Sequence, residues 1–397
     1  MAASAWTREA WTVVGAGPMG ILAVARLLEL APLSERVSWI DASFGCGRLP
    51  KYTSVPGNTI CGKLKRAFLA AEGLDFTSAQ RARRVANEGE PDCVQGKRTL
   101  IDTNATQTCG LNLCVDAFRD ATAALRLHPR VSSFVGNVDA LHGDAAGWSA
   151  SVRGGPGDDR VHGNTVVHST HTLLCTGAVP RSAPAGALRV LDEFGIFVAE
   201  HDDVVAPARL AALQRTSPAL ARANWVVVGG SHSGVLAAQN LAVAGASRVT
   251  VLTRSPLRFA EPRGTEHGDG WVKYDGTGLK GTVATWARAP PANVVIEVCG
   301  DALDDAALAR RAVQRGANAV AYCIGFDRIA PPVLEYMSRA VALDAAYVAR
   351  SAHVEGAPRL YGIGLGFPGE FDFIYRYILS ESCSRFDLLP LIYFYFK

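Results

Sequence analysis

Two glycine-rich turns constrain what this chain can fold into. The first follows the β-branched run 11–14 and reads Gly15-Ala-Gly17-Pro18-Met19-Gly20. The second follows the run 225–228 and reads Gly229-Gly-Ser231-His232-Ser233-Gly234. Each turn leads into apolar residues at helical spacing and then into a short apolar run, at 37–41 and at 248–253. A strand, a turn, a helix and a returning strand make a βαβ unit, so we expect two such units.

Further apolar runs close the two units, at 172–177 and at 319–325. Between residues 137 and 167, alternating segments surround a glycine-rich turn, which predicts an antiparallel meander, and residues 111–127 are expected to be helical. The predicted fold class is therefore α/β, with two Rossmann-like, doubly wound domains, the second inserted into a discontinuous first domain. We expect the first domain to span 1–205, the inserted one 206–332, and the return to the first 333–397.

Composition agrees with a folded chain and excludes several partners. The 397 residues suggest two domains at about 100–200 residues each, and a hydrophobic fraction of 49% excludes general disorder. The balance of 40 basic and 37 acidic side chains predicts no binding to nucleic acid or to an anionic membrane. Nine cysteines with no secretory signal before them favour a reducing, cytoplasmic compartment.

The first turn has the chemistry of a dinucleotide site. Gly15 permits the tight turn, Gly17 lets a pyrophosphate approach the main chain, and Gly20 lets the helix pack on the strand. The unpaired N–H groups at the start of the helix then hold the anion. Asp41 stands at the end of the next strand, where an acidic side chain binds ribose hydroxyls. Together these features predict a dinucleotide site.

The second turn points to a different nucleotide. Its second strand ends in Thr253-Arg254-Ser255 in place of an acid. A guanidinium at that point suits the 2′-phosphate of NADP, although a solvated arginine is the alternative. His232 is expected to lie near the phosphates or under the helix, in preference to a catalytic role. The other histidines lack the spacing of metal ligands, so no metal site is predicted.

Two such units in one chain resemble the flavoproteins in which an NAD(P)H domain interrupts an FAD domain. The segment Gly45-Cys-Gly-Arg48-Leu-Pro-Lys-Tyr-Thr-Ser-Val-Pro-Gly-Asn58-Thr is similar to flavin-containing monooxygenases and their N-hydroxylating relatives. The resemblance implies FAD at the first turn and places Asn58 beside the flavin as the catalytic position. It also implies cofactor contacts at further positions, namely Arg48, Thr176, Gly177, Gly325 and Gly364.

The resemblance has departures. The family signature Phe-x-Gly-x-x-x-His is not reproduced, because Phe194, Gly195 and His201 occur at a different spacing. Cys109 and Cys114 have the spacing of the disulfide-reductase branch, but they come too late in the chain, and residues five apart on one helix do not share a face. We therefore expect them to be core cysteines. The segment 268–281, with Trp271 and Lys280, is interpreted as a mobile lid or a hairpin.

These features predict an FAD-dependent, NADPH-using oxidoreductase. The favoured hypothesis is a monooxygenase that hydroxylates a small nucleophilic substrate with O2 through a flavin hydroperoxide. One alternative is an NAD(P)H-dependent reductase or oxidase with a disulfide, quinone or protein as acceptor. Another is a flavin-binding regulatory protein with little turnover.

Overall fold

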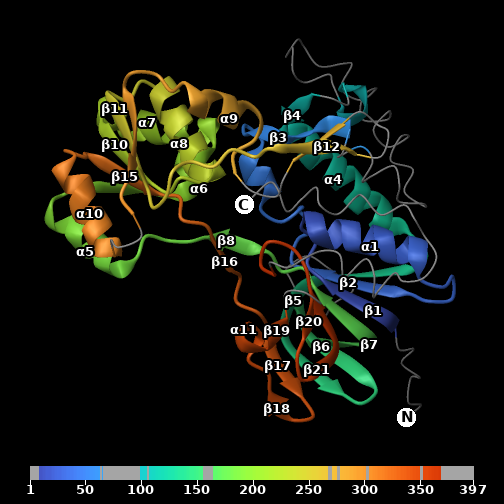
Figure 1. Cartoon of the computed structure of the whole chain (residues 1–397). Coiled ribbons are helices and arrows are strands. Elements are labelled where there is room, and N and C mark those ends of the chain that lie inside the picture. Colours follow the sequence, from blue (N-terminus) through green and yellow to red (C-terminus); the bar gives the residue numbers. More distant parts are fainter. Residues whose placement is uncertain are drawn as a thin grey trace.

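The computed structural model describes residues 9–62, 65, 99–104, 107–154, 164–266, 271–274, 278–300, 304–348 and 352–367. It forms two sheet-containing units that two crossing segments connect (Figure 1). Strand β1 (Glu9–Val14) pairs in parallel with β2 (Val37–Asp41) and β7 (Asn164–Leu174), and α1 (Pro18–Leu30) connects β1 to β2. Val13, Ile21 and Trp39 are fully buried where α1 packs on this sheet. The first predicted βαβ unit is therefore present.

The first sheet is mixed, and its longest strand, β5, pairs with three neighbours. The first residues of β5 (Val131–Asp144) run parallel to β2, and the rest runs antiparallel to β6 (Gly147–Gly154), which pairs with β7. The full strand order is β18-β17-β5-β2-β1-β7-β21-β20-β19, with β6 joined to β5 and β7. The predicted meander is thus attached to the parallel sheet as an extension of β5.

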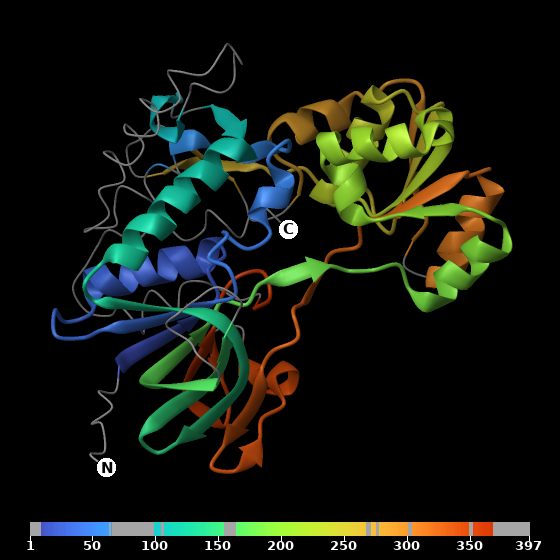
Figure 2. The ribbon, with the colours of Figure 1, turned by 180° about the vertical axis from the view of Figure 1, so that it is seen from behind.

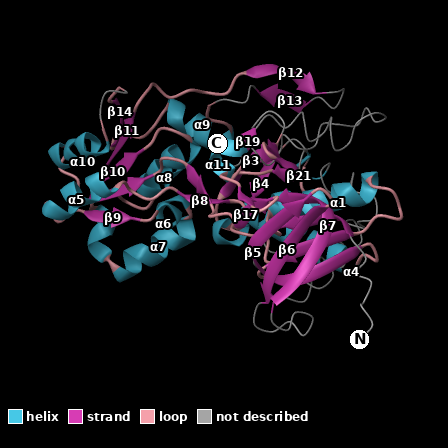
Figure 3. Cartoon of the chain, turned by 90° about the horizontal axis from the view of Figure 1, so that it is seen from below, coloured by secondary structure: helices cyan, strands magenta, loops and turns pink. Residues whose placement is uncertain are grey.

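The second sheet is wholly parallel and has helices on both faces. Its order is β14 (Val294–Val298), β11 (Arg248–Thr253), β10 (Asn224–Val228), β15 (Ala319–Tyr322) and β9 (Phe197–Ala199). Helices α5 (Ala185–Glu193) and α10 (Asp305–Gln314) cover one face. The other face carries α6 (His201–Val205), α7 (Pro207–Thr216), α8 (His232–Val243) and α9 (Gly281–Arg288). Figure 3 shows these helices around the second sheet.

Two crossing segments connect the units. Strand β8 (Ala178–Pro180) carries the chain into the second unit and β16 (Phe326–Arg328) carries it back, and the two pair antiparallel (Figure 2). Strand β9 and helix α5 precede Ala206 but belong to the second unit. We therefore propose that the inserted domain begins after β8, earlier than residue 206. The three residues of β9 are too few to show a strand pattern in the sequence.

The remaining elements complete the first unit and its extensions. Helix α4 (Leu111–Leu127), a helix that the sequence predicted, packs against α1, and β17 (Val333–Tyr336) returns the chain to the first sheet beside β5. The segment around Trp271 forms β13 (Trp271–Tyr274), which pairs antiparallel with β12 (Pro262–Glu266). Residues 268–270 and 275–277 of the predicted lid or hairpin lie outside the described residues. No helix of the described ranges is long and apolar enough to cross a bilayer. The other elements are η1 (Leu49–Tyr52), β3 (Pro56–Ile60), η2 (Leu100–Asp102), β4 (Thr108–Gly110), η3 (Pro218–Arg222), β18 (Arg339–Ala340), α11 (Leu343–Ala346), β19 (Tyr347–Val348), β20 (His353–Val354) and β21 (Ala357–Gly362).

Both turns depend on glycine for close backbone contacts. A Cβ on Gly15 would stand 2.4 Å from the carbonyl oxygen of Cys175, and one on Gly20 would stand 1.9 Å from that of Gly15. Gly15 also has a φ of +109°, which other residues rarely adopt. The second turn repeats the arrangement with Gly229 and Gly234. These positions admit no side chain without displacement of the helix or strand.

Replacing Gly20 by alanine should therefore destabilise the protein. We expect the free energy of unfolding to fall by about 1–3 kcal/mol, the usual effect of overpacking a filled site. The measurement is urea-induced unfolding followed by fluorescence. Gly186 is the matched control, because it lies in α5 and a Cβ there would meet no atom within 4 Å. Gly186→Ala should raise the stability by about 0.5–1 kcal/mol; equal effects of the two variants would contradict the packing argument.

Candidate cofactor and active site

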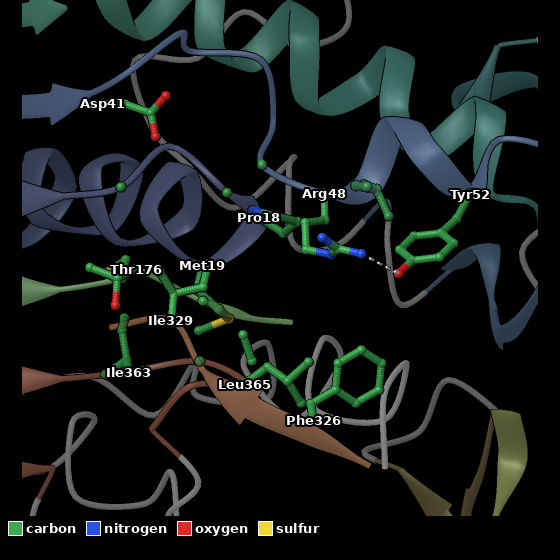
Figure 4. A pocket seen from close by; sticks show the side chains of 18 residues that line it. Pro18, Met19, Asp41, Arg48, Tyr52, Thr176, Phe326, Ile329, Ile363 and Leu365 are labelled. Carbon is green, nitrogen blue, oxygen red and sulfur yellow. Dashed lines mark hydrogen bonds between the residues drawn. The ribbon is translucent and has the colours of Figure 1, made fainter. Parts of the chain in front are cut away.

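A cavity lies where the first turn meets the end of β7 (Figure 4). It brings together residues that the sequence predicted as cofactor contacts, from segments far apart in the chain. Those that line it are Gly15, Gly17, Pro18, Met19, Asp41, Arg48, Thr176, Gly177 and Gly364. Gly20 does not line it; its role is the contact with Gly15 described above. The structure thus brings these predicted residues together around one concave surface.

The cavity has features that fit a bound dinucleotide. The position of the missing Cβ of Gly17 has no other atom within 4 Å, which leaves the main chain open to a ligand. Helix α1 begins there without a side-chain cap, so its first N–H groups have no side-chain acceptor. The hydroxyl of Thr176 is buried without a hydrogen-bond partner among the described residues, and Thr176 lines the cavity. A polar ligand atom would satisfy it.

Asp41 has a larger structural role than the sequence indicated. Its carboxylate accepts hydrogen bonds from the backbone N–H groups of Ala16 at 2.7 Å, Ser43 at 2.9 Å and Phe44 at 2.7 Å. A carboxylate has about four acceptor positions, so about one remains for a ribose hydroxyl. Asp41 therefore fixes the turn to the segment after β2 and still lines the cavity.

A second, larger cavity of about 900 Å³ surrounds the second turn. The predicted residues that line it are Gly229, Ser231, His232, Arg254 and Gly325. Ser233 and Gly234 do not line it, and a Cβ on Gly234 would stand 1.9 Å from the carbonyl oxygen of Gly229. The volume lies within the usual range for ligand sites, about 300–1,000 Å³.

Positive charge in this second cavity comes from arginines. Arg181, Arg254 and Arg258 all line it, and Asp305 is the acidic residue in its lining. Burial, together with the charge of Lys280, lowers the pKa of His232 to about 4, so this imidazole is neutral near pH 7. The lining therefore has the charge that an anionic nucleotide requires, and His232 adds none to it.

The two cavities adjoin at the connection between the units. Phe326, at the start of β16, and Leu365 line both of them. Figure 4 shows these two side chains beside each other at the edge of the first cavity. Ligands in the two cavities would therefore approach each other at this point.

A buried polar cluster stands beside this junction. Asp202, at the start of α6, accepts hydrogen bonds from Arg48 Nη2 at 2.5 Å and from the Tyr52 hydroxyl at 2.7 Å. His201 Nδ1 lies 3.3 Å from the same carboxylate, and its ring packs edge-on against Phe326. Arg48 and Tyr52 belong to the first unit and Asp202 to the second, so the cluster crosses between them.

The cluster alters the titration of its members. Burial alone would raise the pKa of Asp202, but hydrogen bonds from His201 and Tyr52 and the charge of Arg48 outweigh it and hold that pKa well below its usual range. Burial raises the pKa of Tyr52 to about 12, and the neighbouring Asp202 carboxylate adds to this effect. Asp202 is therefore charged and Tyr52 neutral at any ordinary pH.

The predicted catalytic residue is only partly placed. The backbone of Asn58 belongs to β3, which follows the 3-10 turn η1 that carries Tyr52. The side chain of Asn58 lies outside the described part of the structure. Its catalytic role stays a prediction.

The cysteine pair differs from the sequence-based expectation in its geometry. Cys109 lies in β4, before α4 begins, so the argument from one helix face does not apply, and its Sγ is 3.9 Å from that of Cys114. Both thiols are buried, and neither lines a cofactor cavity. Hydrogen bonding to Cys114 and burial raise the pKa of Cys109 to about 12. A thiol with a raised pKa is a poor nucleophile, which favours a core role.

Several lining residues escaped sequence reasoning. Ile363 and Leu365 line the first cavity and alternate with Gly362, Gly364 and Gly366, a local signal that could have identified them. Tyr52 lies in the segment that resembles flavin-containing monooxygenases, but Asp202, its hydrogen-bond partner, lies outside that segment. Asp202 had no signal, because a carboxylate followed by Asp203 reads as a charged surface.

Comparison with known proteins agrees with this architecture. No protein-family model matches the chain. A curated relative, monooxygenase AgnR1 of Paecilomyces divaricatus, is 30% identical over 298 residues, which cover 72% of this chain and 68% of the relative.

Two solved structures share the fold at low identity. The ornithine N-hydroxylase of Kutzneria sp. 744, with reduced FAD, NADP+ and L-ornithine, has a TM-score of 0.54 and 14% identity, covering 92% of this chain and 95% of its own. Bacillithiol disulfide reductase Bdr of Bacillus cereus has a TM-score of 0.50 and 16% identity, covering 91% and 92%. A common fold therefore includes both oxygenating and disulfide-reducing enzymes, and the cysteines need a direct test.

Replacing Cys109 by alanine should leave catalysis intact. Because the thiol is buried and protonated and lines neither cavity, we expect oxidation of reduced nicotinamide nucleotide to change by less than about twofold. Cys114→Ala is the matched variant. Loss of turnover in both variants, with normal flavin content, would instead show that the pair carries electrons.

Proposed function

The chain belongs to the same family as this fungal monooxygenase, the flavoprotein monooxygenases, and we propose that it uses FAD, NADPH and O2 to hydroxylate a small nucleophilic substrate. The observation that carries the proposal is the junction of the two cavities at Phe326 and Leu365. Two dinucleotide-type sites that adjoin allow a hydride to pass from one bound cofactor to the other. Two sites that lie far apart would not allow this transfer.

The first cavity is the proposed FAD site. The N–H groups at the start of α1 and the open side of Gly17 would hold the pyrophosphate. Asp41 would accept a hydrogen bond from a ribose hydroxyl, and a polar atom of FAD would give the Thr176 hydroxyl the hydrogen-bond partner that it lacks among the described residues. When bound, FAD supplies the redox chemistry by accepting a hydride from NADPH and, once reduced, reacting with O2.

The second cavity is the proposed NADPH site. The second turn would hold the pyrophosphate, and Arg254 would pair with the 2′-phosphate. Arg258 lies in the same lining and adds positive charge. The NADP+ in the Kutzneria structure supports this assignment by fold. His232 would contact the nucleotide as a neutral group.

The first cavity offers an apolar wall that would limit water around the proposed flavin. Pro18, Met19, Leu49, Ile329 and Ile363 make much of its wall apolar. A dry wall slows side reactions with solvent, which oxygen transfer requires. Asn58 is proposed to hydrogen-bond the flavin or the nicotinamide amide. The nucleophilic centre of the substrate would be nitrogen, sulfur or carbon.

The purified protein should contain flavin and should consume NADPH only slowly without O2. The measurement is the visible spectrum, followed by NADPH oxidation with and without oxygen. If NADPH reduces the flavin rapidly but the reduced flavin does not react with O2, the reductase alternative is favoured. Bound flavin with no response to NADPH would favour the regulatory alternative. Absence of flavin would reject all three.

Nucleotide choice gives a separate prediction. Arg254→Ala should raise the KM for NADPH by at least about tenfold, because a charge-assisted contact to the 2′-phosphate is lost. The KM for NADH should change little. Arg222→Ala, at an arginine outside the cavity lining, is the control. Equal changes for NADPH and NADH in Arg254→Ala would reject the assignment.

A further inference from the structure

Among the described residues, Arg48, Tyr52 and Asp202 form a largely buried polar contact between the two units. The Asp202 side chain is 10% exposed and that of Arg48 is 26% exposed. By contrast, the ion pair between Arg181 and Asp327 on the connecting strands is 52% exposed on both sides. Exposed ion pairs contribute little to stability, whereas a shielded pair with further hydrogen bonds holds its partners in one geometry.

On the first unit, the cluster is continuous with the first turn. Gly47, next to Arg48, packs so close to Gly17 that a Cβ on it would lie 3.1 Å from the Gly17 Cα. The turn η1 begins at Leu49, directly after Arg48, and ends at Tyr52. The position of the Arg48 and Tyr52 side chains is therefore tied to the turn proposed to hold the FAD pyrophosphate.

On the second unit, the cluster is continuous with the second turn. The side-chain amide of Asn240 donates to the carbonyl oxygens of Val204 at 3.0 Å and Val205 at 2.8 Å. These hydrogen bonds fix α6, which carries Asp202, to α8, which starts at His232 in the second turn. Helix α6 thus has a fixed position relative to the proposed NADPH site.

We propose that Asp202 is a positioning residue that sets the distance between the two cofactor sites. Its contacts with Arg48 and Tyr52 join the elements that carry the first and second turns at the point where the cavities adjoin. Besides the connection at β8 and β16, the units meet through contacts of α9 with β3 and of α6 with η1, and Asp202 and Tyr52 lie in the second of these pairs. This proposal rests on the proposed function for its catalytic consequence, since hydride transfer requires close approach of the two cofactors.

The kinetic test is anaerobic stopped-flow reduction of the bound flavin by saturating NADPH. In Asp202→Asn the limiting rate should fall by about tenfold or more, because small displacements of reacting groups are costly. The dissociation constant for NADPH and the flavin content should stay near the wild-type values. Asp203→Asn is the matched control, because Asp203 is the neighbouring carboxylate of α6 and pairs with Arg209 of α7 instead of with Arg48 or Tyr52.

A milder variant guards against a folding defect. Tyr52→Phe removes the hydrogen bond to Asp202 and keeps the ring, so the limiting rate should fall in the same direction by a smaller factor. A wild-type rate in Asp202→Asn would overturn the proposal. So would loss of FAD from both variants, since the cluster would then act on flavin binding instead of on the arrangement of the units.

A distance measurement separates this proposal from the proposed function. Spin labels on an unnatural amino acid introduced in place of Leu33 in the first unit and Val243 in the second, which are 87% and 81% exposed, report the separation of the units. Asp202→Asn should broaden or shift the distance distribution, and Asp203→Asn should not. An unchanged distribution overturns the positioning role. If NADPH fails to reduce even the wild type, the proposed function fails while the distance result still decides the role of Asp202.

Discussion

Close backbone contact at the two glycine-rich turns is the constraint on which the rest of the structure depends. In each turn, a glycine with positive φ, Gly15 or Gly229, lies against the carbonyl group of Cys175 or Cys323 next to it. A glycine of the following helix, Gly20 or Gly234, lies in turn against the carbonyl group of Gly15 or Gly229. This packing brings the start of the helix down to the carboxyl ends of the parallel strands. The open N–H groups of the helix therefore face a crevice, where open α/β sheets bind ligands.

The same constraint explains why the protein has no need for a strongly charged surface. Its proposed ligands are small anions, bound by helix starts and by a few arginines at the second cavity. The net charge of +3 is compatible with this, because the positive potential is local. Arg48 and Asp202, whose side chains are 26% and 10% exposed, neutralise each other across the junction.

The sequence predicted much of the fold and the parts of the site that have local signatures. Both βαβ units, α4 and the residues of the first turn followed from spacing that repeats within a few residues. The earlier start that we propose for the inserted unit had no sequence signal, because β9 is short and its partner β15 lies more than a hundred residues away. The cysteine pair was argued from a helix that begins after Cys109, so its thiols are nearer than expected.

The sequence by itself determined which backbone positions could approach a dinucleotide, because glycine freedom, strand pattern and helix start are properties of short segments. It also determined the likeness to flavoprotein monooxygenases, through motifs of the same length. Only the tertiary structure decided how the two sites face each other. That arrangement depends on contacts such as Arg48 with Asp202, which the chain brings together by crossing twice between units. A sequence pattern within a short segment cannot indicate a contact between residues so far apart in the chain.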